Sequence, residues 1–251
     1  MEYTLLLMIP LAFACEYCDS SLGMGYGTTL TPLLLLFGYE PLQIVPAVLM
    51  SEFVTGITAA FFHHSLANVN FRRASKDTRV AMVLAACSVV GTVVAVRLAV
   101  KLPAATMKIW IGFVIVSMGA IILATLNRTP RFTWSKIAAL GTVASFNKGM
   151  SGGGYGPLVM GGQILSGIGV KNAVGITSLA EGLTCLVGVL LFFVFRAEVD
   201  WTLAPWLMAG AVLSVPLGAH TVKRIPEKTI KLAIALLILI LGALTLYKAF
   251  R

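Results

Sequence analysis

"SFNKGMSGGGYGPL", residues 145–158, places five glycines and one lysine inside a long hydrophobic region. Glycine inside a helix costs about 1 kcal/mol relative to alanine, and a lysine within a bilayer costs roughly 3 kcal/mol. Irregular backbone at membrane depth persists only where it is buried in protein or lines a cavity. If the surrounding chain spans a membrane, this stretch predicts a helix that breaks inside the protein.

The composition indicates a membrane protein. Of the 251 residues, 58% are hydrophobic and 12% are charged, whereas soluble domains carry about 25% charged residues. Mean hydropathy is +0.93, and the runs 80–96, 109–127 and 201–222 lack charged residues, close to the length that a bilayer core requires. Glu2 stands where a signal peptide would be basic, so residues 3–15 are interpreted as a retained membrane segment. The chain is therefore predicted to be an integral, polytopic membrane protein.

The hydrophobic pattern predicts an all-α integral membrane fold with ten apolar segments. The first two segments in each set of five have about 15 residues, and at 1.5 Å per residue they reach about 23 Å, less than the ~30 Å of a bilayer core. We therefore expect these segments to be short spans or re-entrant half-helices. The predicted segments are 3–18, 24–38, 41–66, 79–100, 104–126, 132–147, 154–168, 171–195, 201–222 and 229–249.

The chain also repeats itself, because a shift of 129 positions aligns residues 22–55 with nine identities. Matched leucines carry little weight in an apolar sequence, but a glycine–tyrosine cluster and two glutamates match as well. Such self-similarity indicates a duplication, with a first membrane repeat at 1–130 and a second at 131–251 that form one membrane domain. The matched pairs are Gly23 with Gly152, Gly25 with Gly154, Tyr26 with Tyr155, Gly27 with Gly156, Leu36 with Leu165, Gly38 with Gly167, Val45 with Val174, Glu52 with Glu181 and Thr55 with Thr184.

Basic loops predict the orientation, because short cytoplasmic loops of membrane proteins are enriched in lysine and arginine. Loops 67–79, 127–136 and 223–231 carry such residues, and placing all three in the cytoplasm satisfies the alternation of the spans. The two halves then have opposite orientations, which is a recurrent plan of secondary transporters. We expect a multi-pass protein of the cytoplasmic (inner) membrane.

The glycine-rich break predicts an oxyanion site. Half-helix N-termini carry partial positive charge, successive N–H groups form anion nests, and the lysine adds a full charge. The alternative is that the glycines only let helices pack closely. Candidate substrate-binding residues are Lys148, Ser151, Gly152, Gly153, Gly154 and Tyr155 in the second half, and Gly23, Gly25, Tyr26 and Gly27 in the first.

Three acidic residues are candidates for proton coupling. Asp19 aligns with Lys148 under the shift, so the two could form a buried salt bridge, or Asp19 could take up a proton. Glu52 and Glu181 each lie about midway along an apolar segment, where a carboxylate is a functional candidate by default. The structural alternative is a protonated glutamic acid that bonds a neighbouring helix.

The four cysteines lie in apolar segments and do not indicate a disulfide framework. Cys15 and Cys18 share one helix face, where a redox pair or a soft-metal site is conceivable, but structural thiols are the preferred interpretation. Cys185 is interpreted as a packing residue, and His63 and His64 as membrane-interface anchors. The sequence predicts no metal site and no cofactor.

Three motifs carry a resemblance to a known family. They are GMGYGTTLTPLLLLFGYEP at 23–41, FFHHSLANVNFRR at 61–73 and SGGGYGPLVMGGQILSGIGVKNAVGITSLAEG at 151–182. With them, nearly the whole chain resembles the TauE/SafE sulfite exporter family. The resemblance implies a permease for sulfite, thiosulfate, sulfonates or related organosulfur anions, and it adds Thr177 and Ser178 to the candidate substrate-binding residues.

These observations predict a secondary transporter, and not an enzyme, that moves a small sulfur-containing oxyanion and is driven by a proton or ion gradient. The sequence has no P-loop lysine pattern for ATP. Alternatives are a gated anion channel and a membrane thiol oxidoreductase using Cys15 and Cys18. The expected partners are the anionic substrate and membrane lipid, with no nucleic acid, while the sequence leaves the direction of transport and the oligomeric state open.

Overall fold

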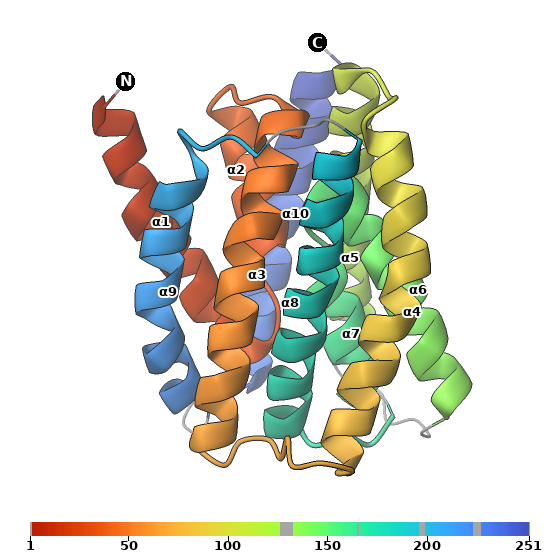
Figure 1. The fold of residues 1–251 in the computed structure, drawn as a ribbon. Helices are drawn as coiled ribbons and strands as arrows, with labels where there is room; N and C mark the ends of the chain where they lie inside the picture. The colour runs from red at the N-terminus through yellow and green to blue at the C-terminus, as the bar shows by residue number, and fades with distance from the viewer. Residues whose placement is uncertain (1, 126–132, 165, 196–198, 223–226, 251) are drawn as a thin grey trace.

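The computed structural model describes residues 2–125, 133–164, 166–195, 199–222 and 227–250, which fold into a bundle of α-helices (Figure 1). Ten helices and no strands lie in these ranges, so the all-α prediction is confirmed. The predicted junction of the two repeats, 127–131, lies outside the described residues. The helices are α1 (Glu2–Leu22), α2 (Tyr26–Leu36), α3 (Pro41–Ser65), α4 (Lys76–Ala99), α5 (Ala104–Thr125), α6 (Trp134–Ser151), α7 (Tyr155–Ile164), α8 (Val170–Val194), α9 (Ala204–Thr221) and α10 (Glu227–Ala249).

Helix length separates membrane spans from half-helices. In the described part of the chain, α1, α3, α4, α5 and α8 are long and apolar enough to cross a bilayer. Helices α2 and α7 have only 11 and 10 residues, so at 1.5 Å per residue they reach about 16 Å. The multi-pass membrane class is therefore confirmed, and so is the short second segment in each half.

The first segment of each half is longer than the sequence predicted. Helix α1 ends at Leu22 and α6 at Ser151, whereas the predicted ends were 18 and 147. The prediction ended each helix where polar residues gather, but these side chains find acceptors within their own helix. Ser21 Oγ donates to the Tyr17 carbonyl at 2.6 Å, and Ser151 Oγ donates to the carbonyl four residues earlier at 2.7 Å. Polar residues therefore do not end these helices.

Glycines with left-handed backbone end both helices at equivalent positions. Gly23 has φ 69° and Gly152 has φ 70°, and each closes its helix with a backbone hydrogen bond. Gly25 (φ 135°) and Gly154 (φ 81°) follow two residues later. Side chains other than glycine are strained in this region, so the repeated glycines set where both helices break.

The helix packing is preserved when the two halves are exchanged. Helix α3 runs antiparallel to its repeat mate α8 and α5 antiparallel to α10, while α4 lies parallel to α6 and α1 parallel to α9 (Figure 1). Under the proposed duplication α4 corresponds to α9 and α6 corresponds to α1, so the parallel α4–α6 pair matches the parallel α9–α1 pair. At the centre, a Cβ on Gly56 would lie 2.8 Å from the Cα of Gly182, so only glycines allow this contact. The packing supports our proposal of inverted repeats with a boundary near residue 130.

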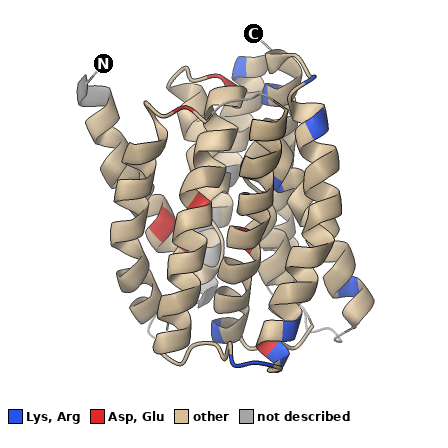
Figure 2. Ribbon diagram, in the orientation of Figure 1, with Lys and Arg blue, Asp and Glu red and all other residues tan. Residues whose placement is uncertain are grey.

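The described parts of the basic loops gather at one end of the bundle. Asn68 Nδ2 donates to the carbonyl of Ala219 at 2.8 Å, which places the end of α9 beside the loop after α3. The parallel packing of α4 and α6 brings Lys136 to the same end, and Figure 2 shows basic residues at this end as well as at the opposite one. Asp200 lies at the other end, since its carboxylate accepts from Gln43 Nε2 at 3.4 Å.

Candidate functional site

The two half-helices meet at their N-termini in the centre of the bundle. A Cβ on Gly153 would lie 2.9 Å from the backbone of Gly27, and a Cβ on Gly156 would lie 2.6 Å from the carbonyl oxygen of Gly23. Close packing therefore accounts for these glycines, as the packing alternative stated. The same contacts bring the positive ends of α2 and α7 together, so packing and anion attraction coincide here.

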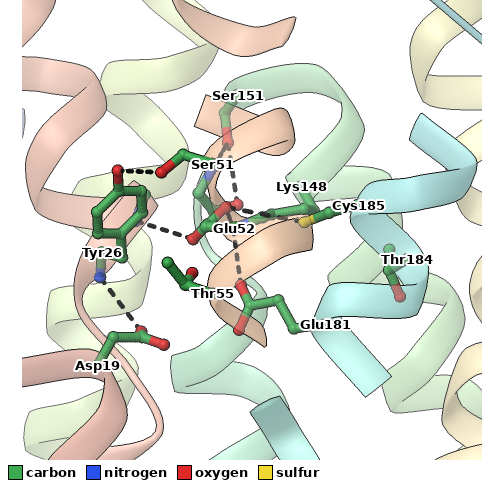
Figure 3. Close-up of polar contacts among 12 residues, drawn as sticks. Asp19, Tyr26, Ser51, Glu52, Thr55, Lys148, Ser151, Glu181, Thr184 and Cys185 are labelled. Atoms are coloured by element: carbon green, nitrogen blue, oxygen red, sulfur yellow. Dashed lines mark hydrogen bonds and ion pairs between the residues drawn. The ribbon is translucent and has the colours of Figure 1, made fainter. Parts of the chain in front are cut away.

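Lys148 joins the two halves through ion pairs. The residue is 1% exposed, and its Nζ lies 2.7 Å from Glu181 Oε1 and also contacts Glu52 Oε2 (Figure 3). Asp19 is not among its ion-pair partners, so the suggested salt bridge between Asp19 and Lys148 is wrong. Glu52 of α3 and Glu181 of α8 both reach Lys148, whereas Asp19 Oδ1 accepts from the N–H of Tyr26 at the start of α2.

Carboxylates occupy the N-terminus of α2. The N–H of Tyr26 donates to Asp19 Oδ1 at 3.2 Å, and the N–H of Gly27 donates to Glu52 Oε1 at 3.2 Å (Figure 3). Negative groups are stabilised at helix N-termini by the unpaired N–H groups and the helix dipole. The anion nest predicted in the first half is thus filled by the protein's own acidic side chains.

The N-terminus of α7 differs from that of α2. The N–H of Gly152 donates to the Lys148 carbonyl at 2.8 Å, and the N–H of Gly153 donates to Ser151 Oγ at 3.1 Å. Among the described residues, the N–H groups of Gly154, Tyr155 and Gly156 have no acceptor. The second half has a lysine where the first has Asp19, so no carboxylate reaches these N–H groups from that position. Of the predicted nest residues, Gly25 in the first half and residues 154–156 in the second keep N–H groups that have no acceptor among the described residues.

The buried centre also contains a carboxyl group that the sequence analysis missed. Glu16 is 2% exposed and accepts hydrogen bonds from Ser20 Oγ at 2.7 Å and Thr55 Oγ1 at 3.1 Å. Its position within the first apolar segment, three residues before Asp19 and on the same helix face, was a signal for it. Four carboxyl groups and one lysine therefore share this region.

A small cavity lies among these carboxyl groups. Its volume is about 10 Å³, which is room for about one water molecule. A sulfur oxyanion is larger than this cavity. The lining residues are Glu16, Asp19, Glu52, Thr55, Gly56, Ala59, Ser178 and Glu181.

Comparison with known proteins identifies the family. Residues 8–245 match the family described as Sulfite exporter TauE/SafE. The chain belongs to this family. It is 25% identical over 244 residues to a protein of Bacillus subtilis (strain 168) named Probable membrane transporter protein YtnM, a match that covers 92% of this chain and 79% of that protein. The predicted TauE/SafE membership is thereby confirmed, and the oxidoreductase alternative is not favoured.

The remaining candidates of this TauE/SafE protein lie around the centre in different roles. Ser178 lines the cavity, whereas Thr177 does not and instead accepts a hydrogen bond from Gln163 Nε2 at 2.8 Å. Cys15 is buried and Cys18 half-buried, and neither is in a disulfide. No cluster that could hold a metal ion occurs among the described residues.

Cys185 and His63 have partners that the sequence did not indicate. The Cys185 thiol donates to Glu52 Oε2 at 3.8 Å, so it contacts the ion-pair cluster as well as packing. His63 is fully buried: its Nε2 donates to the Ser20 carbonyl at 2.9 Å, and its Nδ1 accepts from Asn68 at 3.1 Å. The prediction that His63 anchors the membrane interface is therefore wrong.

A larger pocket opens at the basic end of the TauE/SafE bundle. Its volume is about 410 Å³, and Arg72, Lys171 and His64 contribute the basic part of its lining. The pocket lies between the loop after α3 and the start of α8, away from the crossing of α2 and α7. It is a second place where an anion could lodge, and experiments on the central site must distinguish the two.

Proposed function

We propose that this TauE/SafE membrane transporter is a secondary permease for a small sulfur-containing oxyanion: sulfite, thiosulfate or an organosulfonate. It works in the cytoplasmic membrane with loops 67–79, 127–136 and 223–231 on the cytoplasmic side, and a proton gradient drives it. Support comes from the family's description as sulfite exporters and from the chemistry of the buried centre.

One observation carries the proposal: the N-termini of two half-helices meet beside a buried lysine. Each N-terminus is equivalent to roughly +0.5 charge, and Lys148 adds one more in a region with little water. Once the neighbouring carboxyl groups are protonated, such a place attracts anions, because low-dielectric surroundings weaken charges less than water does. In the proposed complex, Lys148 and the free N–H groups of Gly154, Tyr155 and Gly156 hold the oxyanion.

The acidic residues supply the coupling in this proposal. Glu16, Asp19, Glu52 and Glu181 are each at most 9% exposed, and one lysine cannot neutralise four carboxylates. An isolated buried charge is very costly, so the cluster reaches neutrality by taking up protons. Transport then requires the inverted halves to rock around the site, which exposes it to each side in turn.

Flux into proteoliposomes tests the proposed function. Purified protein is reconstituted, and uptake of radiolabelled thiosulfate is followed with and without an imposed pH gradient. The proposal predicts flux that saturates with thiosulfate, is inhibited by unlabelled sulfite and depends on the gradient. Linear, gradient-independent flux would support the gated channel instead, and no flux above protein-free vesicles for any sulfur oxyanion would reject transport of this class.

A further inference from the structure

The starting point is the difference between the two half-helix N-termini. At α2 the N–H groups of Tyr26 and Gly27 are bonded to the carboxylates of Asp19 and Glu52. These backbone donors are the kind that an oxyanion needs. A bound anion at the crossing therefore competes with these two carboxylates for the same donors.

Charge decides what happens to a displaced carboxylate. Two half-helix ends and one lysine amount to roughly +2, whereas four ionised carboxyl groups amount to −4. An added anion makes the imbalance worse unless protons enter with it. The titratable groups that face Asp19 and Glu52 are Cys15, Glu16 and Cys18 from α1, Tyr26 from α2, Lys148 from α6, and Glu181 and Cys185 from α8.

A second observation points to a proton at this cavity. Glu181 is 5% exposed and lines the cavity, and its Oε2 has no hydrogen-bond partner among the described residues. A buried acceptor without a partner is unfavourable, and a proton or a water that donates to it removes the deficit. The cavity has room for about one water, which also provides a route for a proton between neighbouring carboxyl groups.

We infer that the oxyanion and protons bind together. Besides its contacts with Lys148 and the N–H groups of residues 154–156, the anion accepts hydrogen bonds from the N–H groups of Tyr26 and Gly27. Asp19 and Glu52 leave these donors, and each displaced carboxylate takes one proton from an acid in the aqueous phase. Each O–H bond formed on a carboxyl group replaces the bond to hydrogen that breaks in the aqueous proton donor, and no other covalent bond changes. This inference rests on the proposed function and specifies its coupling: anion and proton move in the same direction.

Calorimetry of thiosulfate binding measures the coupling directly. Thiosulfate does not titrate near neutral pH, so the difference in binding enthalpy between two buffers of unequal ionisation enthalpy gives the protons exchanged by the protein. We expect uptake of one to two protons per thiosulfate, and a Kd that falls about tenfold for each unit by which the pH is lowered and for each proton taken up. Asp19→Asn should reduce the uptake by about one proton, because an amide does not take up a proton in this pH range.

A matched variant provides the control. Glu40 is exposed and pairs with Lys108 at 3.0 Å, away from the central cluster, so Glu40→Gln should leave the proton count unchanged. Proton release, or binding without proton exchange, in the wild-type protein overturns the inference and its proton coupling, while the proposed transport of a sulfur oxyanion stands. Failure to bind thiosulfate, sulfite or methanesulfonate overturns the proposed function and the inference together. Because the wild-type count alone decides, a poorly folding Asp19→Asn protein does not prevent the test.

Discussion

Replacing Lys148 with methionine should destabilise the protein strongly. The ammonium group contacts two buried carboxylates, from Glu52 and Glu181, and removal of one partner of a buried ion pair typically costs about 3–5 kcal/mol. For a chain of this size, each kcal/mol corresponds to roughly 2–4 °C of melting temperature, so the expected loss is about 6–20 °C. A lysine without partners would give the opposite result, because its removal would relieve an uncompensated charge.

Thermal unfolding in detergent at neutral pH measures this loss. The matched control is the triple variant Lys148→Met/Glu52→Gln/Glu181→Gln, which also removes the two negative charges. This variant should recover more than half of the melting-temperature loss seen in the single variant. The loss in the single variant should also shrink at acidic pH, since a protonated glutamic acid has no charge to bury. A single variant that melts within about 1 °C of wild type would refute the ion-pair argument.

Three further predictions concern the crossing, the coupling and the orientation. Gly27→Ala should lower the free energy of unfolding by about 1–3 kcal/mol through overpacking. In the control variant Gly161→Ala the new methyl group meets no atom within 4 Å, so the change should be neutral or stabilising by up to about 1 kcal/mol. Equal melting temperatures of the two variants would contradict the close crossing of α2 and α7. Glu181→Gln should flatten the pH dependence of flux while anion binding stays measurable, and an unchanged pH profile would make the residue structural. Cysteines placed at Arg73 and at Asp200 should react with an impermeant reagent from opposite sides of the membrane, and reaction from one side would contradict the topology.

The sequence predicted the features that depend on composition and on single residue types. Long charge-free runs require membrane spans, because nothing else buries so many apolar side chains in succession. The glycine breaks were predictable because a side chain strains a left-handed backbone, and Gly23 and Gly152 both adopt one. Alignment of the two halves then predicted that the two breaks are equivalent. In the structure Gly23 follows the end of α1 and Gly152 follows the end of α6, the first helix of each half.

The partners within the centre were not predictable in the same way. Lys148 aligns with Asp19, but alignment relates positions by symmetry and does not say which side chains touch. The contact with Glu52 depends on how α3 and α8 cross, and that close crossing requires glycine at position 56. Glu16 has no counterpart in the second half, where the equivalent position holds Ser145, so alignment of the halves gives no signal for it.

Crystals grown with selenite, a heavier analogue of sulfite, test the central claim most directly. Anomalous scattering from selenium locates the anion without any assumption about its site. The account predicts one peak within hydrogen-bond distance of the half-helix N-termini, near the N–H groups of Tyr155 and Gly156 or of Tyr26 and Gly27, with Asp19 displaced from α2 in the latter case. A peak confined to the basic pocket of Arg72 and Lys171, with the centre unchanged, would contradict it.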